Sequence, residues 1–380
     1  MRFVNISLEN WKNFADCDVE LRDRVFLVGP NASGKSNFLD TLRFLHDVSS
    51  IGGGFQEAVT ARRGGVSRLR CLAARKYSDI LIRVSVENEE ASPRWTYELR
   101  FNQDNRQRAI VKSERVQKDG SDIQYRPDRH DQKDPERLTQ TYLEQVNANQ
   151  EFRELANFFT SVRYLHLVPQ LVREPDRYIA KKRDPFGSDF LEQIASTPEK
   201  TRNARLRRIS AALKVAVPQL QELQFHRDDV KGTPHLRGKY EHWRPRGAWQ
   251  NEEQFSDGTL RLLGLLWIVL DGAGPLLLEE PELSLHPEVI RFLPQMLARM
   301  QKRTGRQVFI STHSDDLLTD EGIGLDEVLM LQPSAEGTRV LQANTHAEIS
   351  QLLKSGLSIA EAVLPHTRPK SARQLSFFDW

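Results

Sequence analysis

The chain of 380 residues contains little cysteine and no long hydrophobic run. Its two cysteines, Cys17 and Cys71, form neither a disulfide framework nor a C-x-x-C metal pair, which fits a reducing compartment. The longest apolar stretch, residues 262–270, is far shorter than the ~20 residues of a membrane helix. No charged-then-apolar leader opens the sequence. We therefore expect a cytoplasmic protein that does not enter a membrane.

The chain also lacks a large net charge, which is only +2, but the charge is unevenly distributed. Residues 200–246 hold twelve Lys/Arg and four Asp/Glu, so this basic window carries 12 − 4 = +8 and the remainder carries 2 − 8 = −6. Clustered basic charge is typical of nucleic-acid binding, and aromatic residues nearby can stack on bases. The alternative is the solvated side of an amphipathic helix over residues 202–217. The basic residues are Lys200, Arg202, Arg205, Arg207, Arg208, Lys214, Arg227, Lys231, Arg237, Lys239, Arg244 and Arg246, and the aromatic ones are Tyr240, Trp243 and Trp249.

One glycine-rich segment fits the phosphate-binding pattern G-x-x-x-x-G-K-[ST]. Residues 24–28 predict a buried strand before it, and residues 37–45 predict a helix after it. Phosphate is favoured there because the helix N-terminus offers unpaired N–H groups and a positive dipole end. Lys35 is expected to reach the β- and γ-phosphates, and Ser36 to ligate Mg²⁺. The segment reads Gly29-Pro30-Asn31-Ala32-Ser33-Gly34-Lys35-Ser36.

A second segment, residues 276–282, is an apolar run that ends in two carboxylates. We expect Glu279, at the end of a buried strand, to face the metal. Glu280 comes next and would polarise the attacking water. Together with the phosphate loop, this pattern predicts hydrolysis of a nucleoside triphosphate with Mg²⁺ as cofactor.

Two further motifs flank this strand. Upstream, Ser256-Asp257-Gly258 opens an apolar helix and presents a hydroxyl, backbone amides and a helix dipole to an anion. Downstream, residues 307–311 predict another buried strand, which ends in Thr312-His313-Ser314. His313 would therefore lie at a carboxyl-end loop, where open α/β sheets bind ligands.

The order of these motifs resembles the ABC-type ATPase heads of the SMC, RecF and OLD families, and residues 279–287 are especially similar to the OLD-like group. The resemblance implies an α/β fold: a P-loop NTPase head of ABC type with a mostly parallel core sheet, an antiparallel β subdomain and a helical insertion. Residues 170–255 contain no heptad run, which indicates a head without coiled-coil arms. The 67 residues after His313 contain no Asp-x-Asp pair and are too few for a Toprim nuclease domain.

The resemblance also implies a shared mechanism in which two copies of the chain enclose two ATP molecules. Each ATP would lie on the phosphate loop of one copy and be closed by Ser256 and Gly258 of the other. Glu280 would be the general base, and His313 would contact the γ-phosphate. The ATP-binding residues of the loop and helix would be Gly29, Asn31, Ala32, Ser33, Gly34, Lys35, Ser36 and Asn37.

Several weaker correspondences complete the expected site. Gln170 would approach Mg²⁺, with a plain surface turn as the alternative. Arg62 or Arg63 would reach phosphate, with a solvated loop as the alternative. Lys12 and Asn13 lie in the loop that touches base and ribose in these families. Two departures from the ABC pattern, Glu279 in place of Asp and Asp257-Gly258-Thr259 in place of Gly-Gly-Gln, suggest slow hydrolysis.

We expect four segments along the chain: an N-terminal ATPase lobe with a β meander (1–116), a loop and helical insertion (117–250), a C-terminal ATPase lobe (251–335), and a helical extension with a tail (336–380). Within the insertion, residues 118–137 suggest an exposed loop and residues 137–160 a helix. The aromatic tail, which ends at Trp380, would dock on a partner or fold back.

The sequence thus predicts an ATPase that dimerises around ATP and senses or acts on DNA or RNA. Because an effector domain is missing, it would control a separately encoded nuclease or toxin, as OLD-like ATPases do in phage defence. Two alternatives stay open: a RecF-like DNA repair ATPase, and a scaffold whose nucleotide binding sets assembly.

Overall fold

The computed structural model describes residues 1–74, 78–88, 93–174, 184, 186–243 and 248–368. The aromatic tail and the basic residues Arg244 and Arg246, which the sequence analysis singled out, lie outside the described residues. No helix within these described ranges is long and apolar enough to cross a membrane.

The chain divides into two compact units, each built from separate stretches of sequence. Unit 1 comprises residues 1–163, 273–277 and 301–380, and unit 2 comprises residues 164–272 and 278–300. The division into four consecutive segments stays a prediction.

A six-stranded antiparallel sheet lies in unit 1, in the strand order β2-β1-β4-β5-β6-β7. It confirms the meander predicted within the N-terminal lobe over residues 79–116, to which β1 and β2 are added on one side and β7 on the other. Its strands are β1 (Arg2–Trp11), β2 (Phe14–Glu20), β4 (Ile80–Glu87), β5 (Arg94–Gln103), β6 (Ala109–Lys118) and β7 (Ser121–Arg126).

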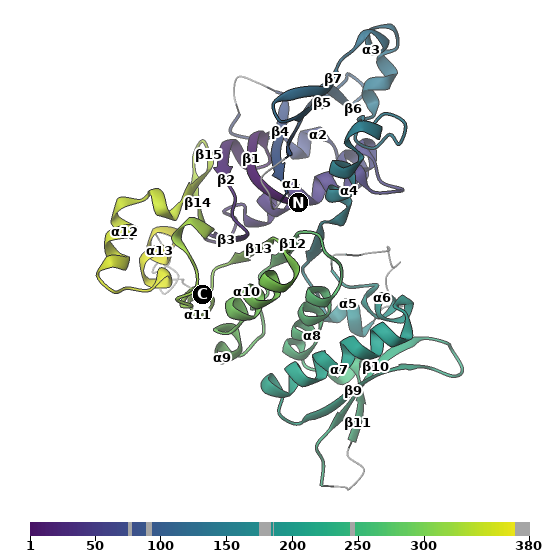
Figure 1. The fold of residues 1–380 in the computed structure, drawn as a ribbon, viewed down its shortest axis with the longest axis vertical. Helices are drawn as coiled ribbons and strands as arrows, with labels where there is room; N and C mark the ends of the chain where they lie inside the picture. The colour runs from purple at the N-terminus through teal and green to yellow at the C-terminus, as the bar shows by residue number, and fades with distance from the viewer. Residues whose placement is uncertain (75–77, 89–92, 175–183, 185, 244–247, 369–380) are drawn as a thin grey trace, which may run out of the picture. The chain divides into compact units, whose positions relative to one another are not determined.

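The second six-stranded sheet has the order β15-β14-β3-β13-β12-β8 (Figure 1). Strands β13 and β14 both run parallel to β3, whereas β15 is antiparallel to β14. The chain passes from one unit to the other within β8 and β12. The strands are β3 (Arg24–Val28), β8 (Arg163–Leu165), β12 (Leu276–Glu279), β13 (Val308–Thr312), β14 (Val328–Ser334) and β15 (Gly337–Gln342).

Aromatic side chains fill the core of unit 1. The ring of Phe3 on β1 lies 4.9 Å from that of Phe158 and 6.4 Å from that of Phe309 on β13, between ring centroids. Phe44 stacks on Phe101 at 5.8 Å. Because such rings each bury a large apolar area, these contacts hold the two sheets and the intervening helices together.

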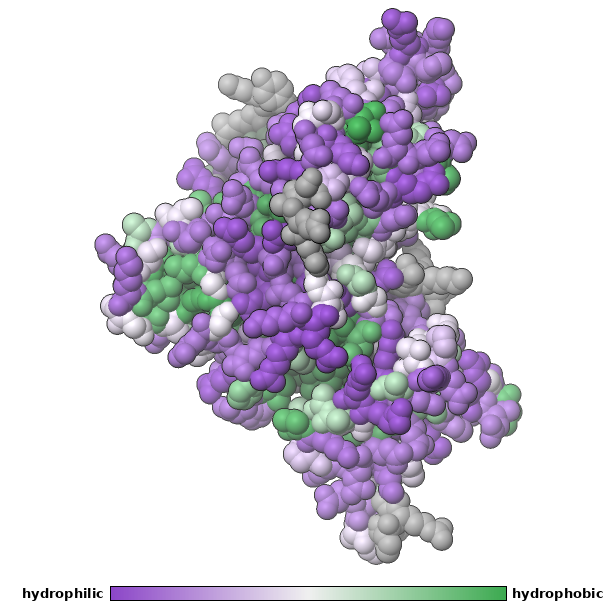
Figure 2. Space-filling model, viewed as in Figure 1, coloured by the Kyte–Doolittle hydropathy of each residue, from purple (hydrophilic) through white to green (hydrophobic). Residues whose placement is uncertain are grey.

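The helices of unit 1 include α1, which confirms the helix predicted after the phosphate loop, and α12 and α13, which lie in the expected extension (336–380) after strand β15. Figure 2 shows a mainly hydrophilic surface, with hydrophobic side chains gathered over α12 and α13. The helices are α1 (Lys35–Ser49), η1 (Glu57–Ala61), α2 (Val66–Leu69), α3 (Arg129–Lys133), η2 (Pro135–Thr139), η3 (Gln150–Phe152), α4 (Arg153–Ser161), α11 (Asp315–Leu318), η6 (Leu325–Glu327), η7 (Ala343–Thr345), α12 (Ala347–Lys354) and α13 (Ile359–Thr367). Helix α10 (Leu293–Thr304) begins in unit 2 and ends in unit 1.

Unit 2 contains a small antiparallel sheet of order β11-β10-β9, and α7 packs on β9 (Figure 1). Helix α7 confirms the predicted amphipathic helix, and at 18 residues it is the longest helix among the described residues. The elements are α5 (Pro169–Arg173), α6 (Phe190–Ser196), α7 (Glu199–Ala216), β9 (Leu220–Arg227), β10 (Pro234–Tyr240), β11 (Ala248–Asn251), η5 (Glu252–Gln254), α8 (Asp257–Leu270) and α9 (Pro287–Ile290).

Two predictions for the insertion are wrong. Residues 118–137 are not an exposed loop, because β7 pairs with β6 and Arg126 is fully buried in an ion pair with Asp131, at 2.7 Å. Of the α-helix expected over residues 137–160, only α4 (Arg153–Ser161) forms. In the preceding residues, side chains rather than helical carbonyls accept hydrogen bonds from several backbone N–H groups. Glu114, for example, accepts hydrogen bonds from the N–H groups of Tyr142 at 2.7 Å and Leu143 at 3.1 Å.

Candidate nucleotide site

The phosphate loop joins β3 to α1 as the sequence predicts. All five residues of β3 are buried, and the loop turns through positive φ at Ala32 (62°) and Gly34 (100°). Glycine is required at position 34, because a Cβ there would lie 2.0 Å from Nδ2 of Asn13. The loop is therefore shaped by its own glycine and by a side chain from the turn between β1 and β2.

Lys35 lies at the first turn of α1, and its side chain is buried at 6% exposure. Its ammonium donates hydrogen bonds to the backbone carbonyl of Gly29 at 2.8 Å and of Pro30 at 3.2 Å. The loop thus folds around a positive charge, while Ser36 and Asn31 are exposed. This arrangement can hold a phosphate group by charge and by backbone N–H groups.

Asn13 lies in the segment that we expected to touch the nucleotide, and its side chain is hydrogen-bonded to the phosphate loop. Its amide Nδ2 donates to the carbonyl of Ser33 at 2.9 Å and to Oγ1 of Thr338 at 2.6 Å, and Asn37 donates to its Oδ1 at 2.8 Å. The Thr338 hydroxyl also donates to the Ser33 carbonyl at 2.9 Å. No motif pointed to Thr338, because it lies 305 residues from Ser33 on the edge strand β15.

Lys12, Arg62 and Arg63 are all engaged by two carboxylates of α1. Asp40 binds Lys12 at 2.6 Å and Arg63 at 2.7 Å, and Asp47 binds Arg62 at 2.8 Å and Arg63 at 2.9 Å. Burial opposes ionisation of Asp40, but Arg63 and then Lys12 outweigh it and hold the pKa of Asp40 well below its usual range. Arg63 is only 6% exposed, so its ion pairs fix the loop after η1 to α1. Nucleotide contacts by these three cations stay predictions.

His313 follows β13, the strand next to β3. The two strands run parallel, with Thr312 paired to Val28, so their carboxyl ends lie at the same edge of the sheet. His313 is exposed, and Ser314 caps the short helix α11 by accepting a hydrogen bond from the backbone N–H of Leu317. The imidazole therefore comes from the strand beside the one that leads into the phosphate loop.

Of the two expected acidic residues, Glu279 is the last residue of β12 and Glu280 follows the strand. In unit 2, the hydroxyl of Tyr164 donates a hydrogen bond to the carboxylate of Glu279, a contact that no motif indicated. Glu280 adopts a left-handed backbone conformation, with φ of 44°, which is unusual for a residue other than glycine. Its carbonyl accepts a hydrogen bond from the N–H of Leu283 at 3.1 Å, closing a turn directly after the strand.

Ser256 and Gly258 open helix α8 in unit 2. The exposed Ser256 caps the helix, because its hydroxyl accepts a hydrogen bond from the N–H of Thr259 at 3.2 Å. A Cβ at Gly258 would lie 2.4 Å from the carbonyl oxygen of Ser284, so only glycine fits. The Asp257 carboxylate between them is bound by Arg173 at 2.6 Å.

Gln170 is exposed in the first turn of α5, where Pro169 occupies the first helical position. Proline suits this position because it lacks the N–H that the first turn leaves unpaired. The unusual Pro-Gln pair thus starts a helix, and the predicted metal contact of Gln170 stays a prediction.

Comparison with known proteins identifies the family. The family model described as "AAA domain, putative AbiEii toxin, Type IV TA system" matches residues 24–320, a span that runs from β3 through His313. The chain belongs to this family. No curated protein matches the chain.

Solved structures with the same fold are ATPase heads of SMC proteins. The SMC head bound to the C-terminal winged-helix domain of ScpA has a TM-score of 0.55 at 12% identity, covering 90% of this chain and 97% of that one. An SMC head with an extended coiled coil, bound to the C-terminal domain of ScpA from Pyrococcus furiosus, has a TM-score of 0.52 at 11% identity, covering 93% and 99%. This AAA-domain family member therefore has the fold of an SMC-type P-loop ATPase head, as the motif order predicted.

Proposed function

We propose that the protein binds ATP on the phosphate loop and hydrolyses it. The observation that carries the proposal is Lys35, whose buried ammonium is held inside the loop by two backbone carbonyls. A γ-phosphate oxygen would replace these carbonyls, so that the ammonium would contact a full negative charge instead of a neutral dipole. Asn13 and Thr338 support the loop in the shape that this exchange needs.

We propose Mg²⁺ as the cofactor, because it prefers oxygen ligands. An exposed hydroxyl at Ser36, a carboxylate at Glu279 and an exposed amide at Gln170 offer oxygen donors of this kind. When bound, Mg²⁺ would neutralise charge on the phosphate oxygens.

We assign Glu280 as the general base and His313 as a γ-phosphate contact. The strained backbone of Glu280 supports a functional constraint, because left-handed conformations persist at non-glycine residues only where the surroundings require them. In its ionised form, the Glu280 carboxylate would accept a proton from the attacking water. The exposed His313 would then hold the phosphoryl oxygens by hydrogen bonding.

A second copy of the chain would complete each site. The N-terminus of α8 presents the exposed hydroxyl of Ser256, the Cβ-free backbone of Gly258 and a positive helix dipole. We propose that these groups bind the γ-phosphate of the ATP held by the other copy. ATP would then join two protomers, and hydrolysis would release them.

The small sheet of unit 2 supports a nucleic-acid contact. Strand alternation places Arg237 and Lys239 of β10 on one face with Trp249 of β11, while Leu236 and Leu223 are buried on the other. Lys239 pairs directly with Trp249, and the guanidinium of Arg237 lies 5.9 Å from the centroid of that indole. We call Arg237, Lys239 and Trp249 the basic sheet face. It combines cations for phosphates with an aromatic ring for bases.

Helix α7, which packs on β9, carries four exposed cations, although two of its arginines are structural. Arg202 lies over the ring of Phe225 at 4.1 Å, and Arg205 pairs with Asp271 at 2.9 Å. The exposed cations are Lys200, Arg207, Arg208 and Lys214. Some cations of the basic window thus pack within unit 2, and the others are candidates for contact with DNA or RNA.

We further propose that this ATPase controls a separately encoded effector. The description of its family, a putative toxin of a toxin–antitoxin system, supports a role in defence. The solved SMC heads named above were bound to domains of ScpA, a second protein. An ATP-gated dimer that senses nucleic acid would supply the switch for such an effector.

Comparing Glu280→Gln with wild type tests the ATPase proposal. The variant should bind ATP with unchanged affinity but hydrolyse it about 100-fold or more slowly, because a positioned base contributes about 10²–10⁴ to the rate. Phosphate release and fluorescent-nucleotide titration measure the two quantities. Glu288→Gln, an exposed change on α9, serves as the control. Hydrolysis by Glu280→Gln at the wild-type rate would remove Glu280 from the mechanism.

Changing the basic sheet face tests the nucleic-acid proposal. Trp249→Ala and Lys239→Glu should each weaken binding of labelled single-stranded DNA or RNA about tenfold, while ATP binding is unchanged, because one stacked base is worth about 1–3 kcal/mol. Fluorescence anisotropy at fixed salt measures this. Lys112→Glu reverses an exposed charge on β6 and should leave binding unchanged. Equal affinity in all four proteins would contradict a contact at this face.

A further inference from the structure

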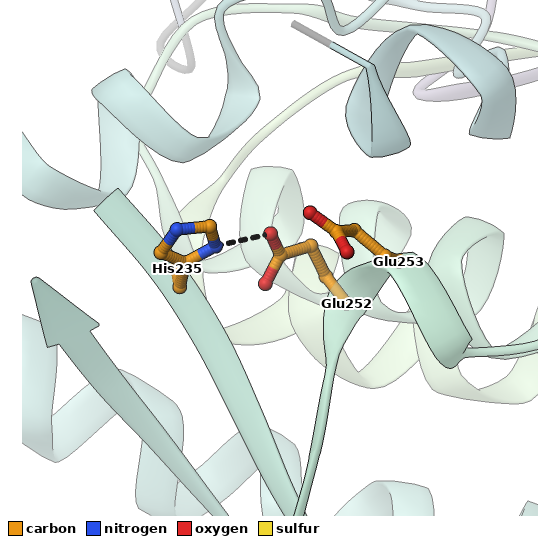
Figure 3. Close-up of side chains that lie close together, drawn as sticks. All are labelled: His235, Glu252 and Glu253. Carbon is orange, nitrogen blue, oxygen red and sulfur yellow. Dashed lines mark hydrogen bonds and ion pairs between the residues drawn. The ribbon is translucent and has the colours of Figure 1, made fainter. Parts of the chain in front are cut away.

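A histidine and two glutamates converge in unit 2, outside every motif of the nucleotide site. One ligand atom from each of His235, Glu252 and Glu253 can be chosen so that all three lie within 4.8 Å of one another. Figure 3 shows the His235 ring facing the Glu252 carboxylate, with the Glu253 carboxylate beside it. We propose that these three residues form a binding site for a divalent transition-metal cation, with Zn²⁺ as the best-fitting ion.

Strand pairing brings His235 close to Glu252, 17 positions away in sequence, and to the adjacent Glu253. His235 lies at the start of β10, and β11 pairs with β10 so that Asn251 stands opposite Arg237. Helix η5 begins directly after Asn251 and carries both glutamates. The pairing of β10 with β11 therefore sets the distance between the imidazole and the carboxylates. Because this distance depends on strand pairing, the sequence contains no recognisable metal-binding motif here.

Two of the three ligands are already oriented by neighbours outside the cluster. The Glu252 carboxylate, 1% exposed, accepts a hydrogen bond from the backbone N–H of Leu236 through Oε2 at 2.8 Å, which turns Oε1 toward His235. On the far side of the imidazole, Nε2 lies 3.0 Å from the hydroxyl of Thr233. Partners of this kind fix the tautomer and the ring orientation of metal-bound histidines.

The electrostatics favour a cation here. The carboxylates of Glu252 and Glu253 lie close to each other and to the His235 ring. Two carboxylates repel each other, and Glu253 is exposed, so its side chain could turn toward solvent instead. The Nδ1 atom of His235 lies 2.8 Å from Oε1 of Glu252. A divalent cation would replace the proton between them and bind both atoms, while the imidazole proton moves to Nε2 and is donated to Thr233.

The chemistry of the ligands indicates the class of metal. One imidazole nitrogen and two carboxylate oxygens match the nitrogen and oxygen ligands of Zn²⁺, whereas Mg²⁺ prefers oxygen ligands and retains several waters. Three protein ligands leave a fourth coordination position for water. Because Glu253 is exposed, water can reach this position from solvent. Because Ser256 lies three residues after Glu253, a bound metal would also order the segment that leads into α8.

Zinc titration of the nucleotide-free protein, after chelator dialysis, tests the site. Isothermal calorimetry should show one equivalent of Zn²⁺ per chain, and Glu253→Gln should weaken that binding about tenfold or more. Glu222→Gln, an exposed change on β9, should bind Zn²⁺ as wild type does. His235→Ala should lose the equivalent altogether. Because Glu253 is exposed, its variant keeps the test valid if His235→Ala does not fold.

A change outside the three ligands adds an independent readout. Thr233→Val removes the hydroxyl behind His235 and should weaken Zn²⁺ binding without changing its stoichiometry. Equal Zn²⁺ affinity in wild type and Glu253→Gln, or no bound Zn²⁺ in wild type, would overturn the proposal. In that case, His235 and Glu252 form a hydrogen-bonded pair only.

Discussion

Lys35 is the residue on which ATP binding depends most. Its ammonium is buried within the loop and donates to two carbonyls, so a phosphate can reach a cation that is already desolvated and positioned. Hydrogen bonds to charged groups are worth about 1.5–3 kcal/mol each. Lys35→Ala should therefore raise the Kd for ATP about 100-fold or more, as measured by fluorescent-nucleotide titration.

The matched control for this residue is Lys112→Ala, which removes an exposed lysine from β6. It should bind ATP as wild type does. If Lys35→Ala bound ATP with wild-type affinity, the loop between β3 and α1 would not be the nucleotide site.

Residues of the candidate site differ in how far the sequence could predict them. Lys35 and Ser36 were found because their motif is local and its residues have fixed roles. Tyr164 and Thr338 were missed because they reach Glu279 and Ser33 across 115 and 305 residues, and neither belongs to a motif. Their positions are set by tertiary packing, which a local pattern does not contain.

At the scale of elements, β6 and β7 are joined by a buried polar cluster. Glu114 and Arg126 are both fully buried, with 3.7 Å between Oε2 of Glu114 and Nη1 of Arg126, and the hydroxyl of Tyr97 donates to Glu114 at 3.0 Å. Burial raises the pKa of Glu114 to about 7, although Tyr142, Arg126 and Leu143 act against it.

This cluster gives a pH-dependent prediction. Between the usual glutamate pKa of about 4.5 and a folded value of about 7, the folded state holds a proton that the unfolded state has lost. The contribution of Glu114 to the free energy of unfolding therefore falls as pH rises through this window. Glu114→Gln lacks this titration, so its stability relative to wild type should increase from pH 5 to pH 8, as measured by urea unfolding.

The control for the pH series is Gln124→Asn on β7, which changes no titratable group and should show the same pH dependence of stability as wild type. A stability difference between wild type and Glu114→Gln that stays constant from pH 5 to pH 8 would show that Glu114 does not titrate in this range.

The same cluster explains which elements the sequence could not predict. Helix α1 and strand β3 follow from regular hydrophobic patterns, and both are confirmed. Residues 118–137 suggested an exposed loop and residues 137–160 a helix, but Arg126 and Asp131 are buried in the first stretch, and Arg126 also lies beside the buried Glu114 of β6. In a sequence, the residues of a buried ion pair cannot be told from charged residues exposed to solvent, because composition does not show which residues contact each other.

At the scale of the whole molecule, the fold class could be predicted because four motifs occur in a fixed order. The two compact units could not be predicted, because each is assembled from separate stretches of the chain. For example, β12 and β13 are far from β3 in sequence but belong to the same sheet. The zinc site of unit 2 lies outside any motif for the same reason, since a hairpin rather than a spacing rule forms it.

The central proposal concerns two copies of the chain. Each copy carries a phosphate loop and an α8 N-terminus, and we propose that ATP is bound between the loop of one and the helix of the other. A nucleotide that cannot be hydrolysed should therefore hold two copies together, whereas ADP should not.

The most direct measurement is the mass in solution of Glu280→Gln with Mg²⁺ and ATP, by light scattering coupled to size-exclusion chromatography. We predict a species of twice 43.8 kDa with ATP, and a single 43.8 kDa chain with ADP or when Lys35→Ala is added. Ser256→Arg in the same background should bind ATP but stay monomeric. Glu280→Gln that binds ATP and remains at 43.8 kDa would contradict the shared site.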